Sequence, residues 1–286
     1  MKFTHVQQRF MDFVVLREEA RVNRAIGMSY PWSSDPIITL YKFCNVNREH
    51  DAVTLWINKN VRNLPKLGHR LLVRNVLIAR IFNDPETLRH IIPSQDSKET
   101  LRRLAVLRKD GQKLFRGAYM MPSHGNSGKG VAVEEYYMRA VDEAMEQEYV
   151  RGSTLADVAE SLMKARGLGE FLANQVCTDL RYTQWWGNAP DWKTFIMCGP
   201  GTRRGLDRWC GDEPTGNGSQ GQYQSRLLEI RERLRGHPTF PPGILRYFDD
   251  INNLSNCMCE WDKAERARDQ FLAGERITLK KYKPHA

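Results

Sequence analysis

Residues 168–182 read LGEFLANQVCTDLRY, and the spacing within this stretch indicates the class of fold. Positions 168, 172, 175, 179 and 182 follow one another at steps of four and three residues, which puts their side chains on one face of an α-helix. Gln175 and Asp179 interrupt the otherwise apolar stripe. Because polar groups on a packing face need partners, we expect either a substrate or an internal hydrogen-bond partner at these two positions.

Helix start signals recur along the rest of the chain. In Ser34-Asp35-Pro36 and in Asn83-Asp84-Pro85, an acidic side chain can cap free amides while proline takes the first helical position. Thr154 with Asp157 three residues later is a weaker version of this signal. The apolar residues after these caps keep helical spacing. The sequence predicts helices at 5–25, 36–44, 49–63, 68–81, 85–91, 97–109, 133–149, 154–166, 168–183, 201–210, 222–235 and 244–272.

The chain is therefore expected to be mostly α-helical, as a single domain of residues 1–286. A stretch near 115–133 contains aromatic residues and then PSHGNSG, which predicts a small hairpin or an ordered loop. It separates two lobes of approximately 1–115 and 133–286. Residues 211–221 read GDEPTGNGSQG and contain too few apolar side chains to hold the segment in one conformation. We therefore expect this segment to be a mobile excursion.

Composition points to a reduced protein with an anionic partner. The 286 residues are 41% hydrophobic and carry a formal net charge of +9, with the excess concentrated between residues 61 and 120. A polyanion is the natural partner, although a well-solvated basic surface is the alternative. The six cysteines form no C-x-x-C pair, and no metal is expected even at Cys257 and Cys259. The first residues resemble neither a signal peptide nor a membrane span.

Residues 193–209, KTFIMCGPGTRRGLDRW, contain the candidate DNA contact. A glycine turn there exposes amides at a helix N-terminus, where a phosphate can bind and arginines can add charge-assisted contacts. This resembles the hairpin turn of helix-hairpin-helix DNA-binding proteins, and an ordinary tight helix connection is the alternative. The predicted DNA-binding residues are Gly199, Gly201, Thr202, Arg203 and Arg204.

Two further stretches of the sequence bring acidic, basic and amide side chains together. The C-terminal helix places Asp250, Asn253, Cys257, Glu260 and Lys263 on one face, although a Glu260–Lys263 pair is also consistent with a surface ion pair. Residues 43–51, FCNVNREHD, crowd polar groups after a capped helix, and Arg48 and Asp51 within it are spaced to face one pocket.

Several enzyme signatures are missing. Residues 124–130, HGNSGKG, lack the spacing of a Walker loop and the Ser or Thr after lysine. Neither a G-x-G-x-x-G opening a βαβ unit nor a G-x-S-x-G elbow occurs. A self-contained kinase, hydrolase or dehydrogenase is therefore not expected.

Eight blocks in order along roughly residues 9–270 resemble one known family. The blocks are 17–19 (REE), 31–36 (PWSSDP), 43–51 (FCNVNREHD), 79–83 (ARIFN), 117–120 (GAYM), 174–180 (NQVCTDL), 199–206 (GPGTRRGL) and 259–263 (CEWDK). They are similar to the α-glutamyl/putrescinyl thymine pyrophosphorylases, also called amino acid:DNA transferases, and to the related helical domain found with 5-hydroxymethyluracil DNA kinases. Cys44 and Trp261 depart modestly from the residues expected in relatives.

The resemblance implies a two-lobed helical fold distantly similar to helix-hairpin-helix DNA glycosylases. It implies an enzyme that acts on double-stranded DNA after a kinase has converted 5-hydroxymethyluracil to its pyrophosphorylated form. The amine of a free amino acid or polyamine then displaces pyrophosphate. The resemblance requires no cofactor and no membrane, and it places the reaction in the bacterial cytoplasm during phage infection.

The chemistry that the resemblance implies assigns roles to particular residues. Cations stabilise the departing pyrophosphate and a carboxylate takes the proton of the amine. Aromatic rings stack on the flipped base, and amides read its edge. The candidates are Arg17, Arg48 and Lys263 for pyrophosphate; Asp179, then Asp51 or Glu260, for the base; Trp32, Phe43 and Tyr119 for stacking; Gln175 and Asn45 for the uracil edge; and Asp35 as a further substrate-binding residue.

Two other functions stay open. A glycosylase-like enzyme would use Asp179 or Asp207 to stabilise a sugar cation and would leave abasic sites. A non-catalytic accessory would position a separate kinase on modified DNA and would bind without turnover.

Overall fold

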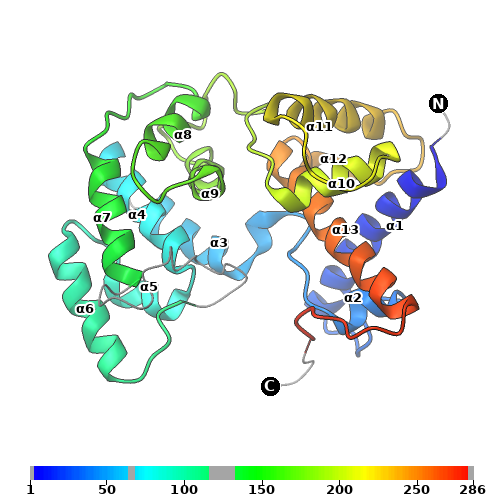
Figure 1. Cartoon of the computed structure of the whole chain (residues 1–286), viewed down its shortest axis with the longest axis horizontal. Coiled ribbons are helices and arrows are strands. Elements are labelled where there is room, and N and C mark those ends of the chain that lie inside the picture. The colour runs from blue at the N-terminus through cyan, green and yellow to red at the C-terminus, as the bar shows by residue number, and fades with distance from the viewer. Residues whose placement is uncertain (1–2, 64–67, 116–132, 283–286) are drawn as a thin grey trace. The chain divides into compact units, whose positions relative to one another are not determined.

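The computed structural model describes residues 3–63, 68–115 and 133–282. Within these ranges the chain is helical and contains no strand, only an isolated antiparallel bridge between Tyr41 and Lys281 (Figure 1). The prediction of a mostly α-helical fold is therefore confirmed. The hairpin predicted near 115–133 and the stacking role of Tyr119 lie outside the described residues.

Internal contacts divide the chain into two compact units. One consists of Met1–Asp51 together with Ile196–Ala286, and we call it the split unit. The other is Ala52–Phe195, the inserted unit. These divisions differ from the lobes expected from the sequence, because the C-terminal helix packs on the N-terminal one. The prediction of a single domain stays a prediction.

The split unit is built around its longest helix. Its elements are α1 (His5–Ala25), α2 (Pro36–Leu40), the 3-10 turn η1 (Arg48–His50), α10 (Pro200–Cys210), α11 (Gln220–Arg235), α12 (Pro242–Tyr247) and α13 (Ile251–Leu272). Phe10 of α1 meets Trp209 and Trp261 edge-on, each at a centroid distance of 5.4 Å. These fully or almost fully buried rings join α1, α10 and α13 in one core.

The close approach of α10 to α13 depends on two glycines. A Cβ atom on Gly205 would lie 2.3 Å from the carbonyl oxygen of Met258, and one on Gly201 would lie 2.5 Å from Cys259 Sγ. Because neither distance leaves room for a side chain, these glycines set the spacing of the two helices.

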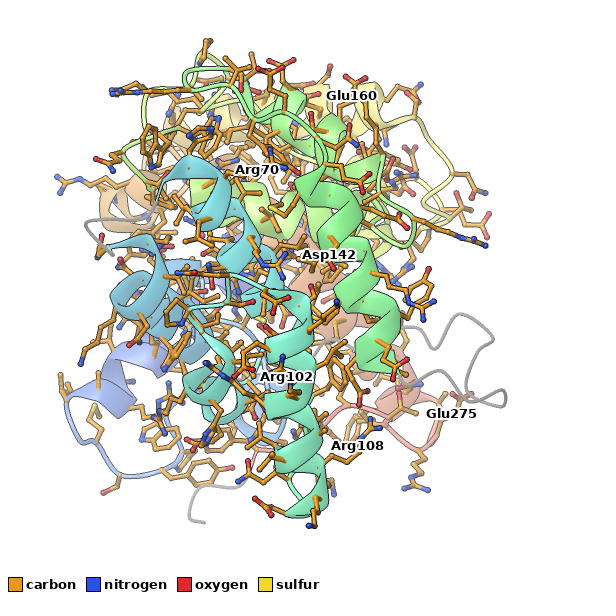
Figure 2. The ribbon with its side chains drawn as sticks, turned by 90° about the vertical axis from the view of Figure 1, so that its left-hand side faces the viewer. Arg70, Arg102, Arg108, Asp142, Glu160 and Glu275 are labelled. Carbon is orange, nitrogen blue, oxygen red and sulfur yellow. The ribbon has the colours of Figure 1, made fainter. Side chains whose placement is uncertain are left out.

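The inserted unit surrounds a central buried helix. Its elements are α3 (Ala52–Ile57), the π-helix η2 (Asn58–Arg62), α4 (His69–Phe82), α5 (Pro85–Ile91), α6 (Ser97–Lys109), α7 (Val133–Met145), α8 (Leu155–Met163) and α9 (Glu170–Leu180). Helix α4 is buried at every position from Leu72 to Phe82. Figure 2 shows α6 and α7 side by side, with Arg102 and Arg108 on α6 and Asp142 on α7.

The predicted helix bounds are confirmed for α1, α5 and α6. The helix predicted at 244–272 is interrupted, because the Asp250 carboxylate accepts the amide of Asn252 and starts α13 anew. The helix predicted at 36–44 ends at Leu40, because the next residues pair with the C-terminal segment. The helix predicted at 49–63 is a 3-10 turn, then α3, then η2.

The excursion predicted at 211–221 is held by the core instead of being free. Asp207, buried on α10, accepts the amide of Gly216 at 2.8 Å and the hydroxyl of Tyr223 at 3.0 Å. The same hydroxyl accepts the amide of Gly218 at 3.0 Å. Backbone hydrogen bonds to two buried polar groups thus replace the apolar anchoring that the segment lacks.

Candidate functional site

A cavity of about 240 Å³ opens in the split unit beside the C-terminal half of α1. We call it the arginine pocket. Its described lining includes four cationic side chains and no carboxylate. The cations are Arg17, Arg21, Arg24 and Lys42; the aromatic lining is Tyr30, Trp32, Tyr41, Phe43 and Tyr282; the rest is Ala20, Ser33, Ile38, Thr39, Cys44 and Asn45.

The sequence of α1 explains how the cations gather. Arg17, Arg21 and Arg24 are spaced by four and three residues, so one helical face presents all three to the pocket. Ala20 lies among them and leaves room for the cavity. An electropositive hollow with aromatic walls suits a ligand that combines a flat ring with negative charge.

Arg17 is the unusual member of this set. The residue is 5% exposed, and its Nε and Nη1 atoms have no hydrogen-bond partner among the described residues. Its remaining contacts are weak: Nη2 lies 3.8 Å from Cys257 Sγ, and the guanidinium lies 5.1 Å from the Phe13 ring centroid. Because burying an unpaired cation is costly, an anion close to this guanidinium would stabilise it.

The other pocket cations have partners. Arg21 Nη2 lies 2.7 Å from Glu18 Oε1, and this hydrogen bond raises the pKa of Arg21. Arg24 lies over the Trp32 ring and Lys42 over the Tyr282 ring. These groups add positive potential to the pocket, whereas Arg17 lines it with a buried guanidinium that has two unpaired nitrogens.

The predicted Glu260–Lys263 pair does not line the pocket but contacts three residues that do, Lys42, Phe43 and Cys44. Lys263 Nζ is 2.7 Å from Glu260 Oε2, donates to the Lys42 carbonyl at 3.0 Å and lies 4.6 Å from the Phe43 ring centroid. Glu260 Oε2 also accepts the amide of Cys44 at 3.0 Å. Glu260 is buried, so the pair is more than an exposed ion pair. Burial raises the pKa of the Cys44 thiol, which keeps it protonated and a poor nucleophile.

A polar cluster follows directly in the chain. Asp51 Oδ1 accepts both the backbone amide and the side-chain amide of Asn45 at 3.0 Å. Arg48 Nε lies 4.0 Å from Asp51 Oδ2, and the Arg48 backbone amide donates to Asn253 at 3.0 Å. Of the predicted residues in this stretch, Phe43 and Asn45 line the arginine pocket. Asp51 accepts hydrogen bonds from Asn45, and Arg48 contacts Asp51.

Of the predicted residues Trp32 and Asp35, only the first lies at the arginine pocket. Trp32 lines the pocket. Asp35 caps α2 by accepting the amides of Ile37 and Ile38, and it forms an ion pair with Arg268 on α13. Its contacts therefore hold α2 against α13, and its assignment to substrate binding stays a prediction.

Asp179 and Gln175 lie on α9 in the inserted unit, and both are buried. Asp179 has no exposed surface; its two oxygens accept Nε and Nη2 of Arg80 at 2.5 and 2.9 Å, and Arg62 Nη1 lies at 3.6 Å. This geometry agrees with one of the two alternatives from the sequence, in which Asp179 has a hydrogen-bond partner inside the protein. The general-base role of Asp179 stays a prediction.

The predicted DNA-binding turn also makes internal contacts. Thr202 donates to the Ser255 carbonyl at 3.0 Å, and Arg203 Nε donates to the Cys198 carbonyl at 2.8 Å. Arg204 Nε lies 3.0 Å from the buried Asp262. Gly199 is the N-cap of α10, and Gly201 packs against α13. These contacts fit a tight helix connection, and phosphate binding there stays a prediction.

Arg21, Arg24 and Tyr282 line the arginine pocket but were not among the site residues predicted from the sequence. The i, i+4, i+7 spacing of Arg17, Arg21 and Arg24 is visible there and could have identified the basic face of α1. Nothing local identifies Tyr282, because it reaches the pocket only through the fold of the C-terminal segment.

Comparison with known proteins decides the family. The sequence model described as the 5-hmdU DNA kinase helical domain matches residues 4–273. The chain belongs to this family. The predicted likeness to this helical domain is thus confirmed, while membership of the amino acid:DNA transferases stays a prediction.

A curated relative of this helical-domain protein is the 5-hmdU DNA kinase of Bacillus phage SP10, 28% identical over 224 residues. The match covers 69% of this chain and 35% of that kinase, so the chain spans about a third of the relative's length. No solved structure matches the chain significantly.

Within 3–63, 68–115 and 133–282, His, Cys, Asp and Glu side chains form no group of three or more arranged to hold a metal ion. No helix in the same ranges is long and apolar enough to cross a membrane.

Proposed function

We propose that this chain modifies 5-hydroxymethyluracil in phage DNA by transferring the amine of an amino acid or polyamine to the pyrophosphorylated base, in the infected bacterial cytoplasm. Family membership supports the DNA base, since the relative is named for 5-hydroxymethyldeoxyuridine in DNA. The observation that carries the proposal is the buried guanidinium of Arg17, whose Nε and Nη1 have no partner among the described residues. Such a group suits an anion on an extruded base.

The reaction balances without a cofactor. The amine nitrogen attacks the 5-methylene carbon, a C–N bond forms, and the C–O bond to pyrophosphate breaks with its electron pair leaving on oxygen. Arg17 stabilises the negative charge that grows on the leaving group, which favours the transition state over the ground state. The field of Arg21, Arg24 and Lys42 adds to this effect.

The extra proton of the attached amine needs an acceptor. Glu260 fits this role best among the predicted carboxylates, because Cys44 N joins it to the pocket wall. Lys263 holds the Glu260 carboxylate in place through its 2.7 Å contact. Asp179 by contrast is committed to Arg80.

A second function, a DNA-binding accessory to a separate kinase, is favoured by one observation. The chain matches only 35% of the kinase of Bacillus phage SP10, so the remainder of that protein has no counterpart in the match. The arginine pocket would then hold a phosphorylated base without turnover.

One experiment separates the two functions. The chain is incubated with DNA bearing pyrophosphorylated 5-hydroxymethyluracil and a panel of amino acids and polyamines, and the DNA is digested to nucleosides for mass spectrometry. Transfer predicts pyrophosphate release together with a nucleoside heavier by one amine. Tight binding with unchanged nucleoside masses under every amine would establish the accessory function and reject transfer. Abasic sites would point to base excision.

A further inference from the structure

The segment after α13 returns to the arginine pocket. Residues 277–282, which we call the C-terminal strap, run antiparallel to residues 40–42 (red end of the chain, beside α2 in Figure 1). Lys42 donates its amide to the Lys280 carbonyl at 2.9 Å, and Tyr282 donates its amide to the Leu40 carbonyl at 2.7 Å. The strap is thereby fixed to the pocket wall, and Ile277 and Leu279 pack against the core of the split unit.

The strap ends by adding an aromatic ring to the pocket. Tyr282 meets Trp32 edge-on at a centroid distance of 5.3 Å, and Trp32 meets Tyr30 in the same way at 5.6 Å. Trp32 is held by its own hydrogen bond to the Met28 carbonyl at 2.6 Å. We call Tyr30, Trp32 and Tyr282 the aromatic wall; all three line the cavity that contains Arg17.

The two halves of the pocket select for different parts of a ligand. A cationic hollow alone accepts any phosphate, whereas aromatic faces favour a flat ring such as a nucleobase. Lys42, 5.8 Å from the Tyr282 ring centroid, and Arg24, 5.9 Å from that of Trp32, flank the wall with positive charge. Rings bordered by cations are the arrangement that single-stranded nucleic acid sites use.

We propose that the C-terminal strap is the specificity element of the arginine pocket, with Tyr282 stacking on the base whose phosphate Arg17 binds. The ligand class is a pyrimidine nucleotide with a phosphorylated 5-substituent, rather than free phosphate or pyrophosphate. The strap lies beyond residues 4–273, which the family model matches, so it adds recognition to the matched helical domain. The identity of the base rests on the proposed function; the preference for a base over a bare anion does not.

The test compares two probes on the full chain at one salt concentration. The first is a short DNA strand with a single phosphorylated 5-hydroxymethyluracil among abasic sites, and the second is inorganic pyrophosphate competing for the same pocket. Tyr282→Ala is expected to weaken the strand by about tenfold and to leave pyrophosphate unchanged, since only the stacking surface is lost. Tyr282→Phe retains the ring and is expected to restore binding.

Two further variants complete the design. Arg17→Gln is expected to weaken both probes, and Phe271→Ala, which removes an aromatic ring that is 69% exposed, is expected to weaken neither. Equal loss of both probes in Tyr282→Ala, or loss of neither, would overturn the proposal. If the wild-type chain transfers no amine but Tyr282→Ala still loses only the strand, the proposed function fails and the role of the strap survives.

Discussion

At the scale of single residues, a buried charge without a partner and a buried charge with a partner affect the stability of the folded protein in opposite ways. Arg17 leaves two guanidinium nitrogens without partners among the described residues, whereas Asp179 has both oxygens bound by Arg80. A buried group without a partner costs stability in the free protein and gains it back when a ligand supplies the partner. A paired buried group contributes to the fold instead.

Replacement of Arg17 by glutamine is expected to reduce turnover by about 100- to 1,000-fold, because the pocket loses the buried positive charge that stabilises the leaving group. The melting temperature should stay the same or rise, since Arg17 makes no ion pair within the described residues. Single-turnover rates and thermal unfolding of the variant measure both effects. Arg102→Gln, at a side chain that is 72% exposed on α6, is the matched control and should change neither. A large drop in melting temperature for Arg17→Gln would contradict this account.

Replacement of Asp179 by asparagine is expected to lower the free energy of unfolding by about 3–5 kcal/mol, because the Arg80 and Arg62 guanidiniums lose their buried counter-charge. Urea unfolding followed by circular dichroism gives the value. A variant that folds with wild-type stability yet lacks turnover would instead support the general-base role predicted for Asp179.

At the scale of elements, the contact between α10 and α13 leaves no room for added atoms. Because a Cβ on Gly205 would meet backbone rather than a movable side chain, the helices themselves would have to separate. Arg204 and Arg208 of α10 also converge on the buried Asp262 of α13, which fixes the register of the pair. Of the two glycines in the predicted phosphate-binding turn, Gly201 packs closely against Cys259 of α13, whereas a Cβ on Gly199 would meet nothing within 4 Å.

Replacement of Gly205 by alanine is expected to destabilise the chain by about 1–3 kcal/mol through overpacking. Gly221→Ala in α11 is the control, because an added Cβ there meets nothing within 4 Å, and it should be neutral or stabilising by up to about 1 kcal/mol. Chemical denaturation of the two variants side by side is the measurement. Equal stability of both would show that α10 and α13 adjust freely.

At the scale of the whole molecule, buried thiols link stability to pH. Burial raises the pKa of the Cys44, Cys177 and Cys257 thiols above the ordinary value of about 9, in the case of Cys257 to about 11. Above pH 9 the unfolded chain releases these protons while the folded chain keeps them, so the free energy of unfolding falls as pH rises. Below pH 9 both states keep them, and this contribution is fully present.

The expected slope is about 1.4 kcal/mol per pH unit for each thiol above about pH 9. Urea unfolding at neutral pH and at about pH 10 measures it. Cys177→Ala should make the decline shallower, because one ionising group is removed from the unfolded state. Stability that is independent of pH across this window would be inconsistent with buried, protonated thiols.

The helices and the basic character could be predicted from the sequence, because caps and periodic apolar residues act over a few positions. The bounds of α1, α5 and α6 agree with the structure for this reason. The candidate site could be predicted in part: Arg17, Trp32, Phe43 and Asn45 line one pocket, and Glu260 with Lys263 abuts it.

Only the tertiary structure decided which polar residues have partners. Asp179 and Gln175 share a face of α9, yet nothing in residues 168–182 reveals that Arg80 occupies the Asp179 carboxylate. Tyr282 likewise reaches the arginine pocket because a distant segment pairs with residues 40–42. Local sequence encodes the dihedral angles and the faces of helices, whereas burial and pairing are set by contacts between residues far apart in the chain, which periodicity does not contain.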